Sequence, residues 1–89
     1  METNLLRKLI EPKVGKFLRS ARTMAGLSLE AAAQKLGYSE AERLDQHERG
    51  SSVECCEFIR ITERYGIPKW FVAEFLADLQ HEVWQLKKK

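Results

Sequence analysis

Residues 26–50 have the sequence GLSLEAAAQKLGYSEAERLDQHERG, which predicts two short helices joined by a tight turn. Ser28 is a suitable N-cap for the first helix, because its side-chain oxygen can accept from an unpaired backbone N–H. The apolar residues after it share one helix face; they are Leu29, Ala32, Ala33 and Leu36. Gly37 then supplies a positive φ, which glycine adopts without steric cost. The first helix is therefore expected over residues 28–36.

Residues 39–49 are predicted to form the second helix of this pair. Ser39 and Glu42 stand three residues apart, which is the spacing of a capping box at a helix start. The helix can extend to Arg49 and end at Gly50, because glycine favours helix ends. The two adjacent alanines of the preceding helix leave room for a close crossing. A helix, a glycine turn and a second helix form the pattern of a helix-turn-helix unit.

Four segments in and around this unit match one known family. They are VGKFLRSARTMAGLS, AAAQKLG, HERG and YGIP, which start at Val14, Ala31, His47 and Tyr65. With these segments the chain resembles the lambda-repressor-like (Cro/Xre-type) DNA-binding domains over about residues 14–76. The resemblance implies an all-α fold, a five-helix lambda-repressor-like helix-turn-helix domain at residues 12–76, with an extended C-terminal helix. It also implies a sequence-specific DNA-binding transcriptional regulator, namely a repressor acting as a homodimer on a palindromic operator.

Length and composition agree with a single small helical domain. The chain has 89 residues, of which 44% are hydrophobic, with two prolines and five glycines. Such a small core leaves a thin margin of stability, which favours oligomerisation. No apolar run reaches the roughly 18 residues of a membrane span, and no secretory signal is visible. We expect a cytoplasmic protein without membrane contact, and the resemblance implies a bacterial or phage-encoded one.

Charge is unevenly distributed along the chain, although the net charge is only +2. Residues 1–26 hold six basic and two acidic side chains, whereas residues 37–50 hold two basic and four acidic ones. The overall balance is a weak argument for a nucleic-acid partner. The basic first segment is a better one, because a local basic surface can attract phosphate even when the net charge is small.

The helix predicted over residues 12–25 combines an apolar face with a basic one. Its apolar positions are Val14, Phe17, Leu18, Ala21 and Met24. Its basic residues recur at every third position; they are Lys13, Lys16, Arg19 and Arg22. Such a stripe is usually only a solvated face. The resemblance implies instead that Arg22 pairs with Glu48 near the DNA backbone. The residues of this helix expected to contact phosphate are Lys16, Arg19 and Arg22.

Double-stranded DNA is the implied partner, and further contacts to it are expected. Unpaired N–H groups and the helix dipole at the start of residues 28–36 favour a phosphate beside Ser28. Ser51 and Ser52, in the loop after the second helix, either contact phosphate or form a simple polar turn. The residues expected to contact bases are Glu42, Arg43 and Gln46. Arginine suits guanine, glutamine suits adenine, and a carboxylate can accept from cytosine.

Three positions depart from the family pattern. Leu29 stands where many members have a glutamine that contacts phosphate, so one side-chain contact is expected to be lost. Leu44 follows Gly37 by seven positions instead of the common six. The extra residue either shifts the start of the second helix or lengthens the turn before it. His47 occupies a position that is usually apolar, and we interpret it as a residue at the edge of the core.

The N-terminal segment, residues 1–11, is expected to form an arm or a short helix outside the domain. It carries an amphipathic cluster of apolar residues; they are Leu5, Leu6, Leu9 and Ile10. Pro12 argues against a helix that continues through it, because the residue before a proline avoids the α region. A frayed terminus is the alternative.

Residues 54–65 predict another helix, which carries both cysteines. Its inner face is expected to contain Cys55, Phe58, Ile59, Thr62 and Tyr65. Adjacent helical positions point about 100° apart. One of Cys55 and Cys56 is therefore expected to be buried and the other to lie near the surface, both as free thiols.

Residues 69–86 predict a long C-terminal helix that begins after Pro68. Its residues expected to close the core are Trp70, Phe71 and Phe75. A heptad-like seam runs along the same helix; its members are Val72, Leu76, Leu79, Val83 and Leu86. We interpret this seam, with the extension at residues 77–89, as a homodimer interface. The alternative is that the helix packs back onto its own domain.

No pattern of residues indicates an enzyme, a cofactor or a metal site. The sequence has no glycine-rich phosphate loop, no paired-carboxylate motif and no Cys/His spacing typical of zinc. Two alternatives to a DNA-binding regulator stay open. One is a protein-interaction module on the same fold, such as an antitoxin or a regulatory adaptor. The other is an assembly role for the C-terminal helix, with a vestigial DNA-binding face.

Overall fold

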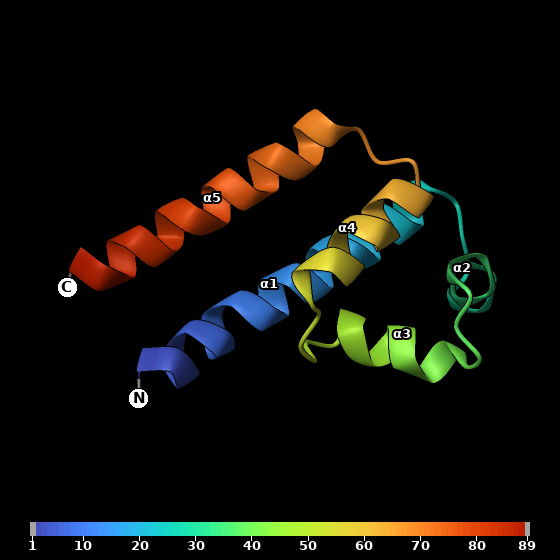
Figure 1. Cartoon of the computed structure of the whole chain (residues 1–89), viewed down its shortest axis with the longest axis horizontal. Helices are drawn as coiled ribbons and strands as arrows, with labels where there is room; N and C mark the ends of the chain where they lie inside the picture. Colours follow the sequence, from blue (N-terminus) through green and yellow to red (C-terminus); the bar gives the residue numbers. More distant parts are fainter. Residues whose placement is uncertain (1, 89) are drawn as a thin grey trace.

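The computed structural model describes residues 2–88, and in that range it consists of five α-helices without a β-strand. The helices are α1 (Glu2–Met24), α2 (Leu29–Leu36), α3 (Ala41–Glu48), α4 (Cys55–Arg64) and α5 (Lys69–Lys88). Figure 1 shows the three short helices gathered at one end of the molecule, while α1 and α5 run side by side toward the two chain ends. Side chains are described for residues 10–85. The all-α prediction is confirmed.

α1 is a single helix of 23 residues that contains Pro12 without a break. The predicted division into an arm at residues 1–11 and a helix from Pro12 onward is therefore wrong. The apolar cluster predicted for that arm, apart from Ile10, lies outside the described side chains.

Side-chain contacts to other parts of the chain flank Pro12 on both sides. Proline removes one backbone hydrogen bond and crowds the preceding turn, so the surrounding structure must hold the helix together. The Ser52 hydroxyl donates to the Glu11 carboxylate. Lys13 Nζ lies 3.0 Å from Glu82 Oε1 of α5. These contacts fix α1 directly before and directly after the proline.

α2 begins and ends as predicted. Ser28 is its N-cap, and the Ser28 hydroxyl accepts a hydrogen bond of 3.1 Å from the Ala31 N–H. Gly37 adopts a φ of 80°, in the left-handed region. The N–H of Tyr38 then donates to the Ala33 carbonyl over 2.9 Å, which closes the end of the helix.

α3 begins later than predicted, at Ala41. Glu40 is its N-cap residue, and no side chain among the described residues caps the helix there. The predicted capping box of Ser39 and Glu42 is therefore wrong. The extra residue between Gly37 and the core lengthens the turn instead of the helix.

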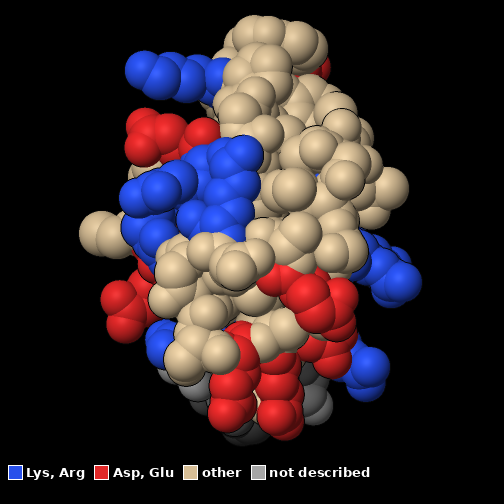
Figure 2. Space-filling model, turned by 90° about the vertical axis from the view of Figure 1, so that its right-hand side faces the viewer, with Lys and Arg blue, Asp and Glu red and all other residues tan. Residues whose placement is uncertain are grey.

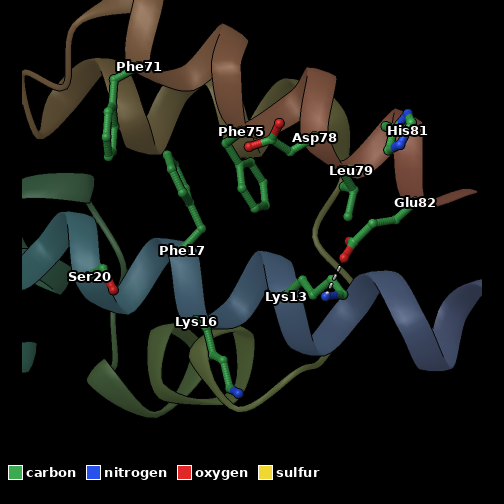
Figure 3. Close-up of a pocket in the computed structure, with 10 residues that line it drawn as sticks. All are labelled: Lys13, Lys16, Phe17, Ser20, Phe71, Phe75, Asp78, Leu79, His81 and Glu82. Atoms are coloured by element: carbon green, nitrogen blue, oxygen red, sulfur yellow. Dashed lines mark hydrogen bonds and ion pairs between the residues drawn. The ribbon is translucent and has the colours of Figure 1, made fainter.

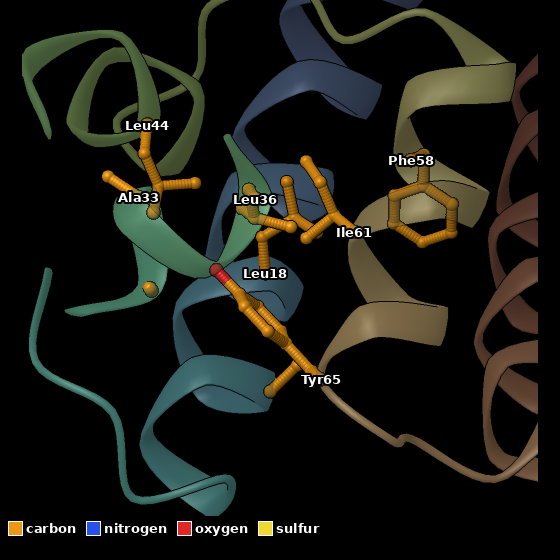
Figure 4. Close-up of a cluster of buried hydrophobic side chains, with 9 residues drawn as sticks. Leu18, Ala33, Leu36, Leu44, Phe58, Ile61 and Tyr65 are labelled. Atoms are coloured by element: carbon orange, nitrogen blue, oxygen red, sulfur yellow. The ribbon is translucent and has the colours of Figure 1, made fainter. Parts of the chain in front are cut away.

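The core joins α1, α2, α3 and α4, as Figure 4 shows. Its buried residues are Leu18, Ala21, Ala32, Ala33, Leu36, Leu44, Phe58, Ile61 and Tyr65. Met24 and Trp70, both predicted to be buried, are 63% and 66% exposed. Met24 is the last residue of α1, at the edge of the packed region, whereas Trp70 precedes Phe71 on α5 and points to a different side from this ring, which packs on Phe17.

α4 presents a different inner face from the predicted one. Phe58, Ile61, Thr62 and Tyr65 are buried, whereas Ile59 is 50% exposed. The predicted positions of Ile59 and Cys55 are therefore wrong, because the packing face is rotated about the helix axis toward Ile61. The two cysteines, at the start of α4, are both exposed free thiols, so the expectation that one is buried is also wrong.

α5 packs on α1 through aromatic rings. The Phe17 ring centroid lies 4.2 Å from that of Phe75 and 5.7 Å from that of Phe71. α5 therefore folds back along α1, and the Lys13–Glu82 ion pair extends this contact toward the chain ends.

Candidate functional site

A charge pair joins α1 to α3. Arg22 Nε and Nη2 donate to Glu48 Oε2 and Oε1 over 2.7 and 3.1 Å, and Arg22 Nη1 donates to the Leu27 carbonyl over 3.0 Å. The Glu48 side chain is only 4% exposed and that of Arg22 15%. Hydrogen bonding to Glu48 raises the pKa of Arg22, so the guanidinium stays charged. This is the pair that the family resemblance implies, and it fixes α3 against α1.

Gly15 lets the end of α3 approach α1 closely. A Cβ at this position would lie 2.6 Å from the Glu48 carbonyl oxygen and 2.7 Å from that of His47. Real Cβ atoms do not come so close to backbone, so any side chain here would push α3 away. Gly15 was not among the residues predicted to have a role. The available signal was an isolated glycine inside a helical pattern, which often marks a close approach of backbone.

The serines predicted to contact phosphate have different surroundings. Ser28 lies exposed at the start of α2, where unpaired N–H groups favour an anion. Ser51 is exposed in the loop after α3. The Ser52 hydroxyl is used, because it donates to Glu11, whose carboxylate would repel a phosphate. The loop therefore offers Ser51 rather than Ser52 for such a contact.

Lys16 and Arg19 are both exposed on α1, as neighbouring members of the basic stripe. Arg19 is three positions before Arg22 and four after Gly15, so it lies on the side of α1 that faces α3. Lys16 lines the groove between α1 and α5, and its side chain extends away from α5 (Figure 3). By its position in the helix, Arg19 lies nearer than Lys16 to the Arg22–Glu48 pair.

The solvent-facing side of α3 carries the residues predicted to contact bases. Glu42 and Gln46 are exposed and lie one turn apart, on the side of the helix opposite the buried Leu44. On one flank Arg49 Nε lies 3.0 Å from Asp45 Oδ2, so this arginine is already paired. Arg43 lies on the other flank, toward α4.

Arg43 is part of a cluster that sequence reasoning did not predict. Its guanidinium carbon lies 5.6 Å from the centre of the Tyr38 ring, and that of Arg60 lies 5.8 Å from the same point. The Tyr38 hydroxyl donates to Glu57 Oε2. Arg60 donates to both Glu57 oxygens, over 2.9 and 2.8 Å, and to the Leu36 carbonyl over 2.8 Å. The cluster therefore connects the end of α2 and the turn after it to α3 and α4.

A hollow of about 640 Å³ lies beside this cluster, with residues of the α2–α3 turn, α3, the loop after α3 and α4 around it. Its lining residues are Tyr38, Arg43, His47, Ser52, Val53, Glu54, Glu57 and Arg60. His47 is half-buried, and its ring centroid lies 6.4 Å from that of Tyr38. Neither ring nitrogen has a hydrogen-bond partner within the described part of the chain. His47 thus lies at the edge of the core and lines the hollow.

The predicted seam of α5 is partly used within the chain. Val72, Leu79 and Val83 are half-buried, whereas Leu76 is 44% exposed. Figure 3 shows Leu79 facing α1 beside Phe75, in a groove of about 640 Å³ between the two helices. The side chain of Leu86 lies outside the described residues.

Figure 2 shows the end of the molecule where the short helices gather. Basic side chains form a group left of the centre of this face with acidic side chains directly above it, and most other acidic side chains lie toward the bottom, at the level of α3 in Figure 1. The face is therefore divided between the two signs of charge. Phosphate binding here would depend on individual basic residues and on backbone N–H groups.

Neither a metal site nor a membrane span is found in the described part of the chain. No three or more His, Cys, Asp or Glu side chains gather in a way that could hold a metal ion. None of the helices within residues 2–88 is both long and apolar enough to cross a membrane. Comparison with protein-family models, curated proteins and solved structures gives no significant match.

Proposed function

We propose that this chain is a sequence-specific DNA-binding transcriptional regulator with a lambda-repressor-like helix-turn-helix domain. α2 and α3 form the helix-turn-helix unit in this proposal, and α3 enters the major groove. Two copies, joined through α5, present their α3 helices about 34 Å apart, which matches two half-sites of a palindromic operator. Repression follows when the bound dimer occupies a promoter.

The observation that supports this proposal most strongly is the way α3 is held. The Arg22–Glu48 pair and the close approach at Gly15 fix its buried side to α1. Glu42 and Gln46 stay exposed on the opposite side. A short helix with a rigidly anchored back and a polar front suits the direct reading of base edges.

Phosphate contacts are proposed to come from residues around α3. Arg19 lies on the same side of α1 as the Arg22–Glu48 pair, and Arg22 keeps its charge at that crossing. Ser28 and the N–H groups at the start of α2 offer donors to a second phosphate. Ser51 offers a hydroxyl beyond the end of α3.

Selection of binding sites from a pool of random-sequence duplexes tests this proposal. We expect the wild-type protein to enrich a palindrome whose half-sites are about 10 bp apart, one turn of the double helix. Enrichment of an unpaired half-site would contradict the homodimer but not DNA reading. A pool that stays random after repeated selection would contradict sequence-specific binding altogether.

A protein-interaction module, such as an antitoxin or a regulatory adaptor, is the second candidate. Acidic side chains cluster at the start of α3, where Glu40 and Glu42 are exposed. Carboxylates there oppose DNA phosphates and suit a basic protein surface. Co-purification with a small basic partner would favour this candidate. A stable homodimer that binds DNA alone would count against a required partner.

A further inference from the structure

The Arg43 side chain lies over an aromatic ring and near the Glu57 carboxylate, whose pKa its charge helps to lower. Its guanidinium carbon lies 5.6 Å from the centre of the Tyr38 ring. No hydrogen bond or ion pair within residues 10–85 uses its N–H donors. A cation–π contact attracts the charge to the ring but does not use the donors at the edge of the guanidinium. Arg43 is therefore held in place with its donors free.

The Tyr38 side chain is itself fixed through its hydroxyl group. Its hydroxyl donates to Glu57, which also accepts two hydrogen bonds from Arg60. These bonds lower the pKa of Glu57 to about 2, with Arg60 as the main cause. Burial raises the pKa of Tyr38 to about 12. At neutral pH the carboxylate is charged and the phenol protonated, so the hydrogen bond between them persists.

The ring of Tyr38 is not what closes the turn between α2 and α3. The backbone does so, since the Tyr38 N–H donates to the Ala33 carbonyl and Gly37 takes the left-handed conformation. Arg60 ties α4 to the Leu36 carbonyl without using Tyr38. The ring lies between Arg60 of α4 and two residues of α3, His47 and Arg43, and the charged group of α3 beside it is Arg43.

We propose that Tyr38 is the positioning residue for Arg43, and that its ring holds the guanidinium at the flank of α3 for bidentate binding to a guanine edge in the major groove. This inference rests on the proposed function and assigns a specificity-determining role within it. An arginine that is ordered before binding loses less side-chain entropy when it meets the base. Tyr38 itself contacts no base in this proposal and acts only through Arg43.

Nuclear magnetic resonance of the free protein tests the positioning step without DNA. We expect the Arg43 Nε–H to be restrained on the nanosecond timescale in the wild type and in Tyr38→Phe, which keeps the ring. In Tyr38→Leu it should become as mobile as the Nε–H of Arg64, an exposed arginine in the last turn of α4. A mobile Arg43 in the wild type would overturn the proposal, whatever the protein binds.

Binding to the duplex enriched by the wild-type protein, and to a scrambled duplex, tests the consequence. We expect Arg43→Ala to reduce the ratio of the two affinities about tenfold, the effect of losing one bidentate contact. Tyr38→Leu should reduce the ratio in the same direction. The double variant should lose no more than Arg43→Ala alone, because residues that act through one contact are not additive. Tyr38→Phe should stay close to wild type.

Gln46→Ala is the matched control, since Gln46 is exposed on the same helix and it is Arg43, not Gln46, that lies over the Tyr38 ring. Its loss of preference should fall at another base pair and add to that of Tyr38→Leu. Two results would overturn the inference and leave the proposed function standing. One is that the effects of Tyr38→Leu and Arg43→Ala on the affinity ratio are additive. The other is that the Tyr38→Leu protein folds and keeps the wild-type ratio. If the wild type prefers no duplex, the proposed function and this inference fail together. Thermal unfolding of each variant separates these outcomes from loss of the fold.

Discussion

The Arg22 guanidinium and the Glu48 carboxylate meet across the crossing of α1 and α3, through hydrogen bonds of 2.7 and 3.1 Å. Arg22→Met would leave the Glu48 charge buried without its partner, so we expect a loss of about 3 kcal/mol in the free energy of unfolding. Urea denaturation measures it. Arg49→Met is the control, because Arg49 also pairs with a carboxylate, that of Asp45, but its own side chain is 79% exposed. This substitution should lower the free energy of unfolding by less than about 0.5 kcal/mol. Equal losses in the two variants would contradict the role given to the buried pair.

Gly15→Ala should destabilise the protein although alanine favours helix. The better helix propensity of alanine contributes about 1 kcal/mol. The added Cβ would lie 2.6 Å from a backbone oxygen, and backbone is harder to displace than the end of a side chain. We expect the clash to exceed the propensity gain and to leave a net loss of about 1–3 kcal/mol. Ser20→Ala, at an exposed position of the same helix, is the control and should not lower stability. A more stable Gly15→Ala protein would show that α1 and α3 do not cross this closely.

Glu57 should make stability depend on pH in the acid range. Its pKa in the folded protein is about 2, below the ordinary value of 4.5. Because the pKa of Glu57 is lower in the folded than in the unfolded protein, its charge stabilises the fold fully at pH values above the unfolded-state pKa. This stabilisation is lost as the pH falls toward the folded-state pKa. We therefore expect the stability difference between wild type and Glu57→Gln to be constant above about pH 5 and to shrink between pH 4.5 and 2. Glu63→Gln, an exposed position on the same helix, is the control. A difference that stays constant down to pH 2 would contradict the Arg60–Glu57 interaction.

Spacing predicted the all-α class and the bounds of α2 because their determinants are local. The glycine turn at Gly37, the Ser28 cap and the periodic apolar residues of α2 and α5 depend on neighbours within four positions. The helix continues through Pro12, and the contacts on either side of this residue, from Ser52 to Glu11 and from Glu82 to Lys13, are distant in sequence and not visible in the local pattern. Met24 was misjudged because periodicity gives the face of a helix but does not show where its partners end.

The candidate site could be predicted only in part, for the same reason. The Arg22–Glu48 pair was available from the family resemblance. The Tyr38–Glu57–Arg60 cluster was not, because it joins residues 19 positions apart across a turn whose length depends on one extra residue. The restraint of Ser52 by Glu11 was also invisible, since it spans 41 positions.

The exposed part of the α5 seam should decide the oligomeric state. Leu76 is 44% exposed, and Leu76→Asp would place a charge at the centre of the proposed interface. We expect this variant, and a protein truncated after Ala77, to sediment as monomers where the wild type sediments as a dimer. Gln80→Asp adds the same charge at an exposed position outside the seam and should stay dimeric. A Leu76→Asp protein that remains dimeric would rule out the seam as the interface.

Fluorescence anisotropy tests the central proposal most directly. The probes are a duplex from upstream of the protein's own gene and a scrambled duplex of the same composition, each measured across a salt series. We predict tighter binding to the native duplex, with log Kd varying linearly with log salt because each phosphate contact releases counterions. The slope then gives the number of phosphate contacts. No binding to either duplex at low salt would contradict the proposal and direct attention to the acidic start of α3 as a surface for a basic protein partner.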